Sequence, residues 1–402
     1  MAAQNNEKKS QQIGIQNQPG STNYGTQIGI QNNFVINLKN YVNIKKNPNC
    51  PYSKSIFLPE DAEYFFGRDE FVKKLLSAIE TNNFISVLGE LKSGKSSVIL
   101  AGLVPKLYKA KNWLFTFFRP QEDPFYNLAQ ALVPLYIPQD NKKELKTEAK
   151  KLKNSLKNNI TLLSEIINKI QQKNPDKRIL IIADQFEQLY NTSNKYKTRY
   201  KFINALLQTF QSATNKSPLS TILVTIIRTN SSGNIEFDPP LPDALKKHSI
   251  TLEQMTGDQL REVIEKPTRN FGVSVKKRLV ERLIEDAIKQ QKQQKRLAVL
   301  AFALVELWKK QKNKELTYKA YQEITENADI VEVYEREQKK RAEQNSLTKK
   351  TSKNNIINEA PIIYRIVILL FLFFVGMPVI LELFPVIFDS PVRIMCKLKD
   401  KC

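Results

Sequence analysis

The stretch from Phe84 to Leu103, FISVLGELKSGKSSVILAGL, constrains the fold more than any other part of the chain. Its first five residues are apolar except for Ser86 and predict a buried strand, and the residues from Ser97 onward predict the first turns of a helix. Between them, Gly89 to Ser96 matches the pattern GxxxxGK[ST] at every fixed position. Such a loop turns its backbone N–H groups toward a phosphate, and the helix that follows points its positive end at the same anion. The order strand, loop, helix therefore predicts a nucleotide-binding site.

Each fixed position of the loop has a predicted role. Gly89 and Gly94 let the backbone curl around a phosphate. Lys95 is placed to reach the β- and γ-phosphates, and the hydroxyl of Ser96 is placed to hold Mg²⁺. The expected cofactors are therefore ATP or ADP together with Mg²⁺.

A second strand, which ends in a carboxylate, follows further along the chain. Ile179 to Ala183 is an aliphatic run, and Asp184 comes directly after it. A carboxylate at the C-terminal edge of a parallel strand, beside a phosphate loop, is where a second Mg²⁺ contact belongs. We expect Asp184 to make that contact. Glu187, three residues on, is expected to orient or activate the attacking water.

A third apolar run, Thr221 to Ile227, predicts another strand, which ends at Arg228. A basic residue at that strand tip can sense or stabilise the γ-phosphate, although an ordinary surface arginine fits the same position. Together the strands predict an α/β nucleotide-binding domain over residues 51–245, with helices on both faces of a parallel sheet.

The pattern turns helical after this domain. It predicts an all-α lid domain over residues 246–330, without the alternation that strands show. Residues 331–360 are charged and then rich in Ser, Thr, Lys and Asn, and they predict a helical stem and linker.

Residues 1–50 are polar and rich in Gln and Asn, and we expect a disordered tail. Within it, the sequence QIGIQN at residues 12–17 recurs letter for letter at residues 27–32. Each copy alternates apolar and amide side chains, which suits stacked cross-β packing. The repeat resembles the RIP homotypic interaction motif and the related bacterial amyloid-signalling motifs. This resemblance implies a protein partner that docks on residues 12–32; a disordered, amide-rich tail without a partner is the alternative.

The C-terminal part of the chain is strongly apolar. Ile366 to Leu381 is sixteen residues without a charge, and past Glu382 the apolar run continues to Phe388. Since a bilayer span needs about 20 mostly apolar residues, we expect a transmembrane helix over residues 361–388 and a basic tail over residues 389–402. A buried core helix and a re-entrant hairpin are the alternatives. Because ATP is cytosolic, a single crossing would leave the nucleotide-binding domain in the cytoplasm.

The net charge is +22, but only 14 of the 62 basic residues are Arg. Nucleic-acid readers use Arg for bidentate contacts, so this balance favours a solvated surface or attraction to membrane lipid over nucleic acid. His248 is the only histidine, and the three cysteines form no cluster. Histidine-based nucleophilic catalysis and zinc sites are therefore not expected.

Residues from roughly 57 to 325 resemble the STAND class of signalling NTPases, specifically the novel STAND NTPase group that is often joined to WD repeats. The matching stretches are Phe66–Arg68, Gly94–Ser97 with the residues up to Pro105, Asp184–Glu187, and Phe302–Trp308. The resemblance implies that Gly67, Arg68 and Ser97 also belong to the nucleotide site. It implies an AAA+-like core with a helical lid, which cycles between a closed ADP form and an assembled ATP form.

Three positions depart from the family pattern. Gln188 stands where the family usually has an acidic residue, Ala298 where it has a proline, and Asn230 where it has an aspartate. These departures leave slow or absent hydrolysis open, and no WD or TPR array is seen in the sequence.

The expected function is a membrane-anchored, ATP-dependent switch that oligomerises with Mg-ATP in conflict or cell-death signalling. A nucleotide-binding membrane scaffold that does not hydrolyse ATP is the first alternative. A nucleic-acid-handling AAA+ ATPase is the second.

Overall fold

The computed structural model describes residues 33–35, 50–137, 142–159, 161–191, 196–211, 220–230, 247–289, 296–326 and 328–359. The chain divides into two compact units, one that ends at Tyr334 and one that begins at Glu335.

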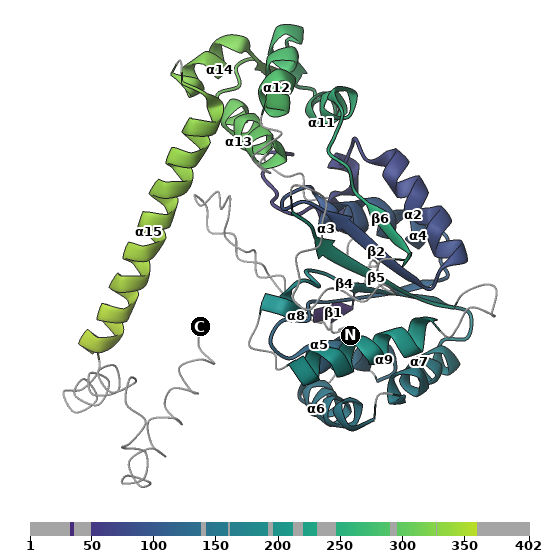
Figure 1. The fold of residues 1–402 in the computed structure, drawn as a ribbon. Helices are drawn as coiled ribbons and strands as arrows, with labels where there is room; N and C mark the ends of the chain where they lie inside the picture. Colours follow the sequence, from purple (N-terminus) through teal and green to yellow (C-terminus); the bar gives the residue numbers. More distant parts are fainter. Residues whose placement is uncertain are drawn as a thin grey trace, which may run out of the picture. The chain divides into compact units, whose positions relative to one another are not determined.

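A six-stranded sheet organises the first unit (Figure 1). Its strands lie in the order β1-β3-β4-β5-β2-β6, and every neighbouring pair is parallel except β1 with β3. The strands are β1 (Asn33–Val35), β2 (Phe84–Gly89), β3 (Trp113–Phe118), β4 (Arg178–Ala183), β5 (Thr221–Arg228) and β6 (Ser249–Thr251). The predicted α/β fold is confirmed, and this strand order fits the expected AAA+-like core.

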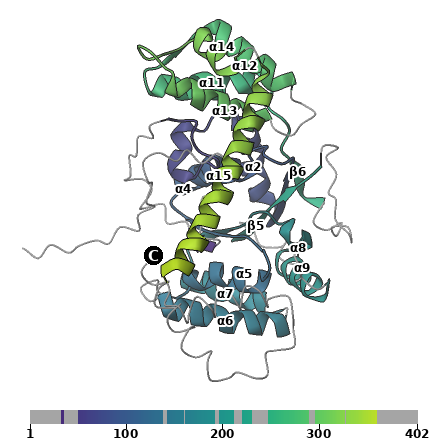
Figure 2. The same cartoon turned by 90° about the vertical axis from the view of Figure 1, so that its left-hand side faces the viewer.

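Helices cover both faces of this sheet, as a parallel sheet requires. Successive residues of a strand point to opposite faces, and β4 shows this clearly. Ile179 and Ile181 pack against α5 (Pro124–Leu132), α6 (Lys142–Asn158), α7 (Leu162–Lys173) and α9 (Tyr196–Gln211). Leu180 and Ile182 pack against α2 (Asp69–Thr81), the π-helical segment η2 (Val98–Leu103) and α4 (Val104–Tyr108). Figure 2 shows the two helical layers on either side of β5.

Short elements complete this domain. They are the 3-10 segments η1 (Pro59–Tyr64) and η3 (Val133–Leu135), together with α3 (Lys95–Ser97) and α8 (Gln188–Asn191).

A separate hydrophobic cluster forms the helical part that follows. Its helices are α11 (Gly257–Asn270), α12 (Lys277–Lys289), α13 (Arg296–Lys309) and α14 (Tyr318–Thr325). The expectation that this part is all-α is wrong in one detail, because β7 (Ser274–Val275) pairs in parallel with β8 (Glu315–Leu316). Leu316 is fully buried, so this short pairing places an apolar side chain in the cluster and satisfies backbone groups beside it.

The structure also moves the expected domain limits. β6 lies beyond residue 245 but pairs with β2, so it belongs to the sheet and not to the lid. Tyr52 packs in the lid cluster, and its hydroxyl donates to the carbonyl of Ile264 at 2.5 Å. β1 falls inside the tail that was expected to be disordered, and it pairs with the edge of β3. The expectation that all of residues 1–50 are disordered is therefore wrong for residues 33–35.

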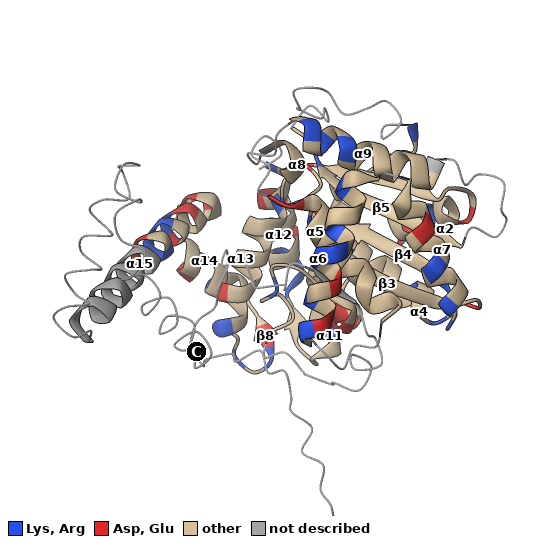
Figure 3. Cartoon of the chain, turned by 90° about the horizontal axis from the view of Figure 1, so that it is seen from below, with Lys and Arg blue, Asp and Glu red and all other residues tan. Residues whose placement is uncertain are grey.

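The helix α15 (Ile330–Glu359) begins in the first unit and continues into the second. Its first half carries both signs of charge along its length (Figure 3), as expected for a charged stem. Within the ranges given above, none of the helices is both long enough and apolar enough to cross a bilayer. The repeat at residues 12–32, the apolar segment 361–388 and the tail 389–402 lie outside the described residues.

Candidate nucleotide-binding site

The predicted phosphate-binding loop joins the end of β2 to α3. Gly94, just before the helix, has φ of +90°, a conformation that favours glycine because it strains other residues. The helix then begins with a bond from the N–H of Val98 to the carbonyl of Gly94 at 2.9 Å. At the other end of the loop, a Cβ added to Gly89 would lie 3.1 Å from Oγ of Ser93. The loop therefore closes tightly between its two predicted glycines.

Lys95 folds back over this loop. Its Nζ donates to the carbonyl oxygens of Gly89 at 2.8 Å and Glu90 at 2.6 Å. Burial lowers the pKa of Lys95 to about 8, while the nearby carboxylates of Glu187 and Asp184 oppose that effect. An ammonium group binds anionic oxygens more strongly than neutral carbonyls, so a phosphate in the loop would compete well for this side chain.

Ser96 and Asp184 meet although β4 and β2 are separated by β5. The Ser96 hydroxyl donates to Oδ1 of Asp184 at 2.7 Å. The chain after Asp184 turns at Gln185, which has φ of +52°, and stays beside β5, where the N–H of Phe186 donates to Ile226 O at 2.9 Å.

The Ser96 and Asp184 pair suits Mg²⁺ in its chemistry. It offers only oxygen donors, and Mg²⁺ is usually held by one or two carboxylates together with substrate phosphates. Over the described ranges, no three His, Cys, Asp or Glu side chains gather to hold a metal ion. The oxygen donors of the pair fit a metal that is held jointly with nucleotide phosphates.

Glu187 and Arg228 lie beside each other at the same edge of the sheet. Oε2 of Glu187 accepts a bond from the backbone N–H of Arg228 at 3.2 Å. Burial raises the pKa of Glu187, which makes its carboxylate a better proton acceptor. Arg228 is exposed, and its positive charge helps to lower the pKa of Lys95. The two predicted catalytic residues are thus brought to the rim of the loop.

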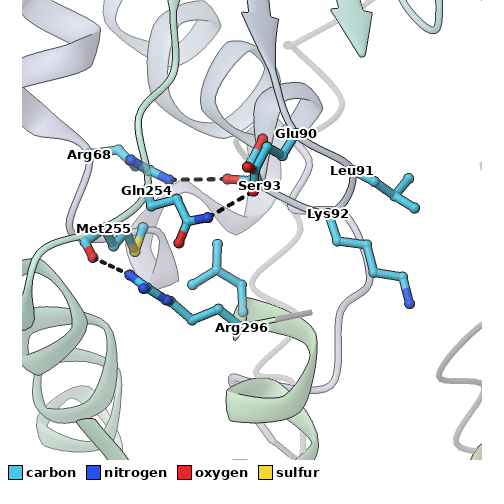
Figure 4. A pocket seen from close by; sticks show the side chains of 9 residues that line it. Arg68, Glu90, Leu91, Lys92, Ser93, Gln254, Met255 and Arg296 are labelled. Carbon is cyan, nitrogen blue, oxygen red and sulfur yellow. Dashed lines mark hydrogen bonds between the residues drawn. The ribbon is translucent and has the colours of Figure 1, made fainter. Parts of the chain in front are cut away.

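Arg68 connects the loop to the segment before α11 (Figure 4), and Gly67 precedes it in the chain. The buried guanidinium of Arg68 donates to Glu253 O at 2.7 Å and to Ser93 O at 3.1 Å. Burial lowers its pKa to about 10. Gly67 has φ of +80°, and an added Cβ would lie 2.7 Å from the carbonyl oxygen of Gln259 in α11. Arg68 therefore ties two segments together through their backbone carbonyls, and Gly67 lets α11 approach closely.

Ser97 takes part in a different contact from the one that was expected. Its hydroxyl accepts a bond from the N–H of Phe57 at 3.1 Å, and the side chain is buried. Its backbone N–H belongs to the first turn of the helix, where such groups lack helical partners. That N–H is the group of Ser97 that a phosphate can use.

Arg119 is a residue of this site that the sequence reasoning missed. It follows β3 directly, and its Nε and Nη2 donate to Oδ2 of Asp184 at 3.0 and 2.9 Å. Both side chains are buried, with 7% and 1% of their surfaces exposed. A signal was present, because Arg119 follows its strand as Asp184 follows the next one, and parallel strands end at the same edge of a sheet.

A shallow hollow lies between the loop, the segment before α11 and the start of α13 (Figure 4). Arg296 of α13 donates to Met255 O at 3.0 Å, and Gln254 donates to Oε2 of Glu90 at 2.8 Å. The hollow is lined by Arg68, Glu90, Leu91, Lys92, Ser93, Gln254, Met255, Arg296 and Leu297. Ala298, one of the three departures, follows the last of these residues and is partly buried in the lid cluster.

Comparison with known proteins gives one family match. The model of the family described as Novel STAND NTPase 1 matches residues 52–348. No curated protein matches the chain significantly.

Several solved structures are similar at low identity. The Aeropyrum pernix ORC2 protein in ADPNP-ADP complexes has 12% identity, covers 68% of this chain and 70% of its own, and has a TM-score of 0.47. The Aeropyrum pernix ORC1 protein in complex with DNA has 12% identity, 66% coverage of both chains and a TM-score of 0.44. Domain III of the Thermotoga maritima replication initiation protein DnaA has 11% identity, covers 67% of this chain and 96% of its own, and has a TM-score of 0.38. All three TM-scores are below 0.5, so the fold assignment rests on the sheet order and the loop of this chain.

Proposed function

The chain belongs to the novel STAND NTPase 1 family, and from that premise we propose that it is a signalling switch set by bound ATP or ADP with Mg²⁺. The observation that carries the proposal is the convergence of Lys95, Ser96 and Asp184 at one loop. Membership of an NTPase family implies nucleotide binding and usually Mg²⁺. The oxygen pair and the lysine supply the two kinds of contact that a metal-bound triphosphate needs.

Phosphate binding would rearrange the loop in a simple way. Lys95 would leave the carbonyl oxygens of Gly89 and Glu90 and bind the β- and γ-phosphates. Backbone N–H groups after Gly94, including that of Ser97, would face the same anion. Ser96 and Asp184 would hold Mg²⁺, which neutralises charge between the phosphates.

Hydrolysis is the finer part of this proposal. Glu187 is the residue we assign to orient and deprotonate the attacking water, since burial raises its pKa. Arg228 at the tip of β5 would stabilise charge on the γ-phosphate. Gln188 replaces the second acidic residue, so we propose slow turnover. The competing function is a scaffold that binds nucleotide without hydrolysis, which the same Gln188 favours.

A direct contact between the loop and α15 supports a switching role. Nζ of Lys92, at the outer turn of the loop, donates to the hydroxyl of Tyr334 at 3.2 Å. Tyr334 is buried in the first turns of α15, and its ring packs edge-on against Phe302 of α13 at 5.6 Å between centroids. A loop that reshapes around a triphosphate would therefore act on the lid and on the start of the stem. We propose that this change exposes surfaces through which subunits assemble.

The proposed output comes from the two ends of the chain. Residues 361–388 would anchor the protein in a membrane as a single crossing, with the NTPase domain in the cytoplasm. Assembly would then bring the repeats of residues 12–32 close together, where they could template a β-stacked complex with a partner in conflict or cell-death signalling. These assignments rest on the sequence pattern of the two segments.

The nucleotide claim is tested by ATP affinity in the Lys95→Ala variant. We expect ATP binding, measured by calorimetry with Mg²⁺ present, to be lost or greatly weakened. Lys73→Ala is the matched control, because Lys73 is exposed and pairs with Glu70 of its own helix at 2.7 Å. Equal ATP affinity in the wild type and the Lys95→Ala variant would refute the assignment of the loop.

A further inference from the structure

A buried ion pair at the edge of the sheet is the feature that the family pattern and the loop do not explain. Arg119 and Asp184 are almost wholly enclosed, and two N–H groups of the guanidinium bind the same carboxylate oxygen, Oδ2. The other oxygen, Oδ1, accepts from Ser96. Each oxygen of Asp184 therefore has its own partner.

The backbone holds both members of this pair in place. β3 and β4 run in parallel, with Phe118 beside Ala183, and the N–H of Asp184 donates to Phe118 O at 2.9 Å. Arg119 and Asp184 thus leave the sheet at the same level. On the far side of Arg119, the side-chain amide of Asn127 donates to Pro120 O at 2.8 Å. The connection from β3 to α5 is therefore fixed on both sides of the arginine.

The chemistry of the pair matters for the metal site. A carboxylate on one strand end can rotate, and the direction of Oδ1 decides whether it faces Ser96. Arg119 holds Oδ2 with two donors of one rigid plane while Ser96 holds Oδ1, and these contacts together set the rotation of the carboxylate. A lysine could supply the charge but not the planar pair of donors.

Lys95 provides a competing partner for Asp184. The negative charge of Asp184 already raises the pKa of Lys95 and so favours its charged form. Without Arg119, the buried carboxylate would lose its ion-pair partner, which is costly, and the positive charge of Lys95, which already interacts with it, would attract it. A turn toward Lys95 would take Asp184 from the metal and Lys95 from the phosphates.

We propose that Arg119 is a positioning residue of the Mg²⁺ site, which acts through Asp184 and touches neither metal nor nucleotide. The proposal rests on the proposed function, because it assumes that Ser96 and Asp184 hold Mg²⁺ with ATP. Outer partners of metal ligands typically change metal affinity by about 10- to 100-fold when they are removed.

The test measures how much Mg²⁺ the full-length protein needs to bind ATP. ATP binding is followed by calorimetry over a series of Mg²⁺ concentrations and also in EDTA. In the Arg119→Gln variant, we expect the half-saturating Mg²⁺ concentration to rise by about 10- to 100-fold, with little change of ATP affinity in EDTA. Arg119→Lys should show a smaller rise, because it restores charge without the planar pair of donors. In an Asp184→Asn background, Arg119→Gln should have no further effect.

Arg178→Gln is the matched control. Arg178 lies at the opposite end of β4 and pairs with Glu80 at 2.9 Å, so its loss should leave the Mg²⁺ requirement unchanged. A folded Arg119→Gln variant with an unchanged or lower Mg²⁺ requirement would overturn the proposal and would leave ATP binding itself intact. If that variant does not fold, the Mg²⁺ requirement of Arg119→Lys is used instead, since that variant keeps the buried charge. A raised requirement supports the proposal, and an unchanged one overturns it. A wild-type protein that binds no ATP would instead refute the proposed function.

Discussion

The pKa of Lys95 makes ATP affinity depend on pH in a range where few other side chains titrate. Burial lowers this pKa to about 8 in the protein without nucleotide. A lysine with this pKa is about nine-tenths charged near pH 7 and about one-tenth charged near pH 9. A triphosphate bound to Lys95 favours the charged form and so raises the pKa in the complex. The complex therefore binds more protons than the free protein, and affinity must fall as pH rises through the pKa of the free protein.

The size of the effect follows from the fraction of Lys95 that is charged. Between pH 7 and pH 9, ATP affinity should fall by about tenfold, which is about 1.4 kcal/mol. The assay is calorimetry of ATP binding at saturating Mg²⁺, at several pH values across this range. The Lys95→Ala variant, at whatever residual affinity it keeps, should lose this dependence. Constant affinity in the wild type, or an equal fall in the variant, would refute the role given to Lys95.

Two further changes test other parts of the account. Glu187→Gln should slow single-turnover ATP hydrolysis by about 10²- to 10⁴-fold while ATP still binds, and an unchanged rate would mean that Glu187 does not activate the attacking water. Gly67→Ala should lower the free energy of unfolding by about 1–3 kcal/mol, because it combines a positive φ with a Cβ only 2.7 Å from Gln259 O. Gly272 has a similar positive φ of +63°, but a Cβ added there would have no neighbour within 4 Å. Thermal melting should therefore show a smaller loss of stability for Gly272→Ala than for Gly67→Ala. Equal losses would mean that the close approach of α11 to Gly67 is unimportant.

Much of the central architecture could be predicted because apolar runs and fixed loop positions carry strong local signals. The strands that begin at Phe84, Ile179 and Thr221 were expected within a residue or so of their observed limits. Asp184 was found by its place after a strand, and the structure brings it to Ser96. The same rule, applied to the preceding strand, would have pointed to Arg119.

Other features depend on contacts that no local pattern reports. β7 and β8 have two residues each, too few to show alternation. β1 has three residues in a polar segment, and it forms because the edge of β3 offers backbone partners. Tyr52 joins the lid through a hydrogen bond to the carbonyl of Ile264, which is far along the chain. Arg68 also binds backbone carbonyl oxygens, and because every residue has one, the sequence does not show which of them is the partner. Such contacts are set by tertiary packing, so the sequence pattern could not have located them.

The central claim is that bound nucleotide sets the state of assembly, and the size of the full-length protein tests it most directly. Detergent-solubilised protein is measured by light scattering coupled to size exclusion, first with ADP and then with Mg-ATP. We predict a larger assembly with Mg-ATP than with ADP, and no such increase in the Lys95→Ala variant. The same mass with both nucleotides, when calorimetry shows that both are bound, would contradict the account.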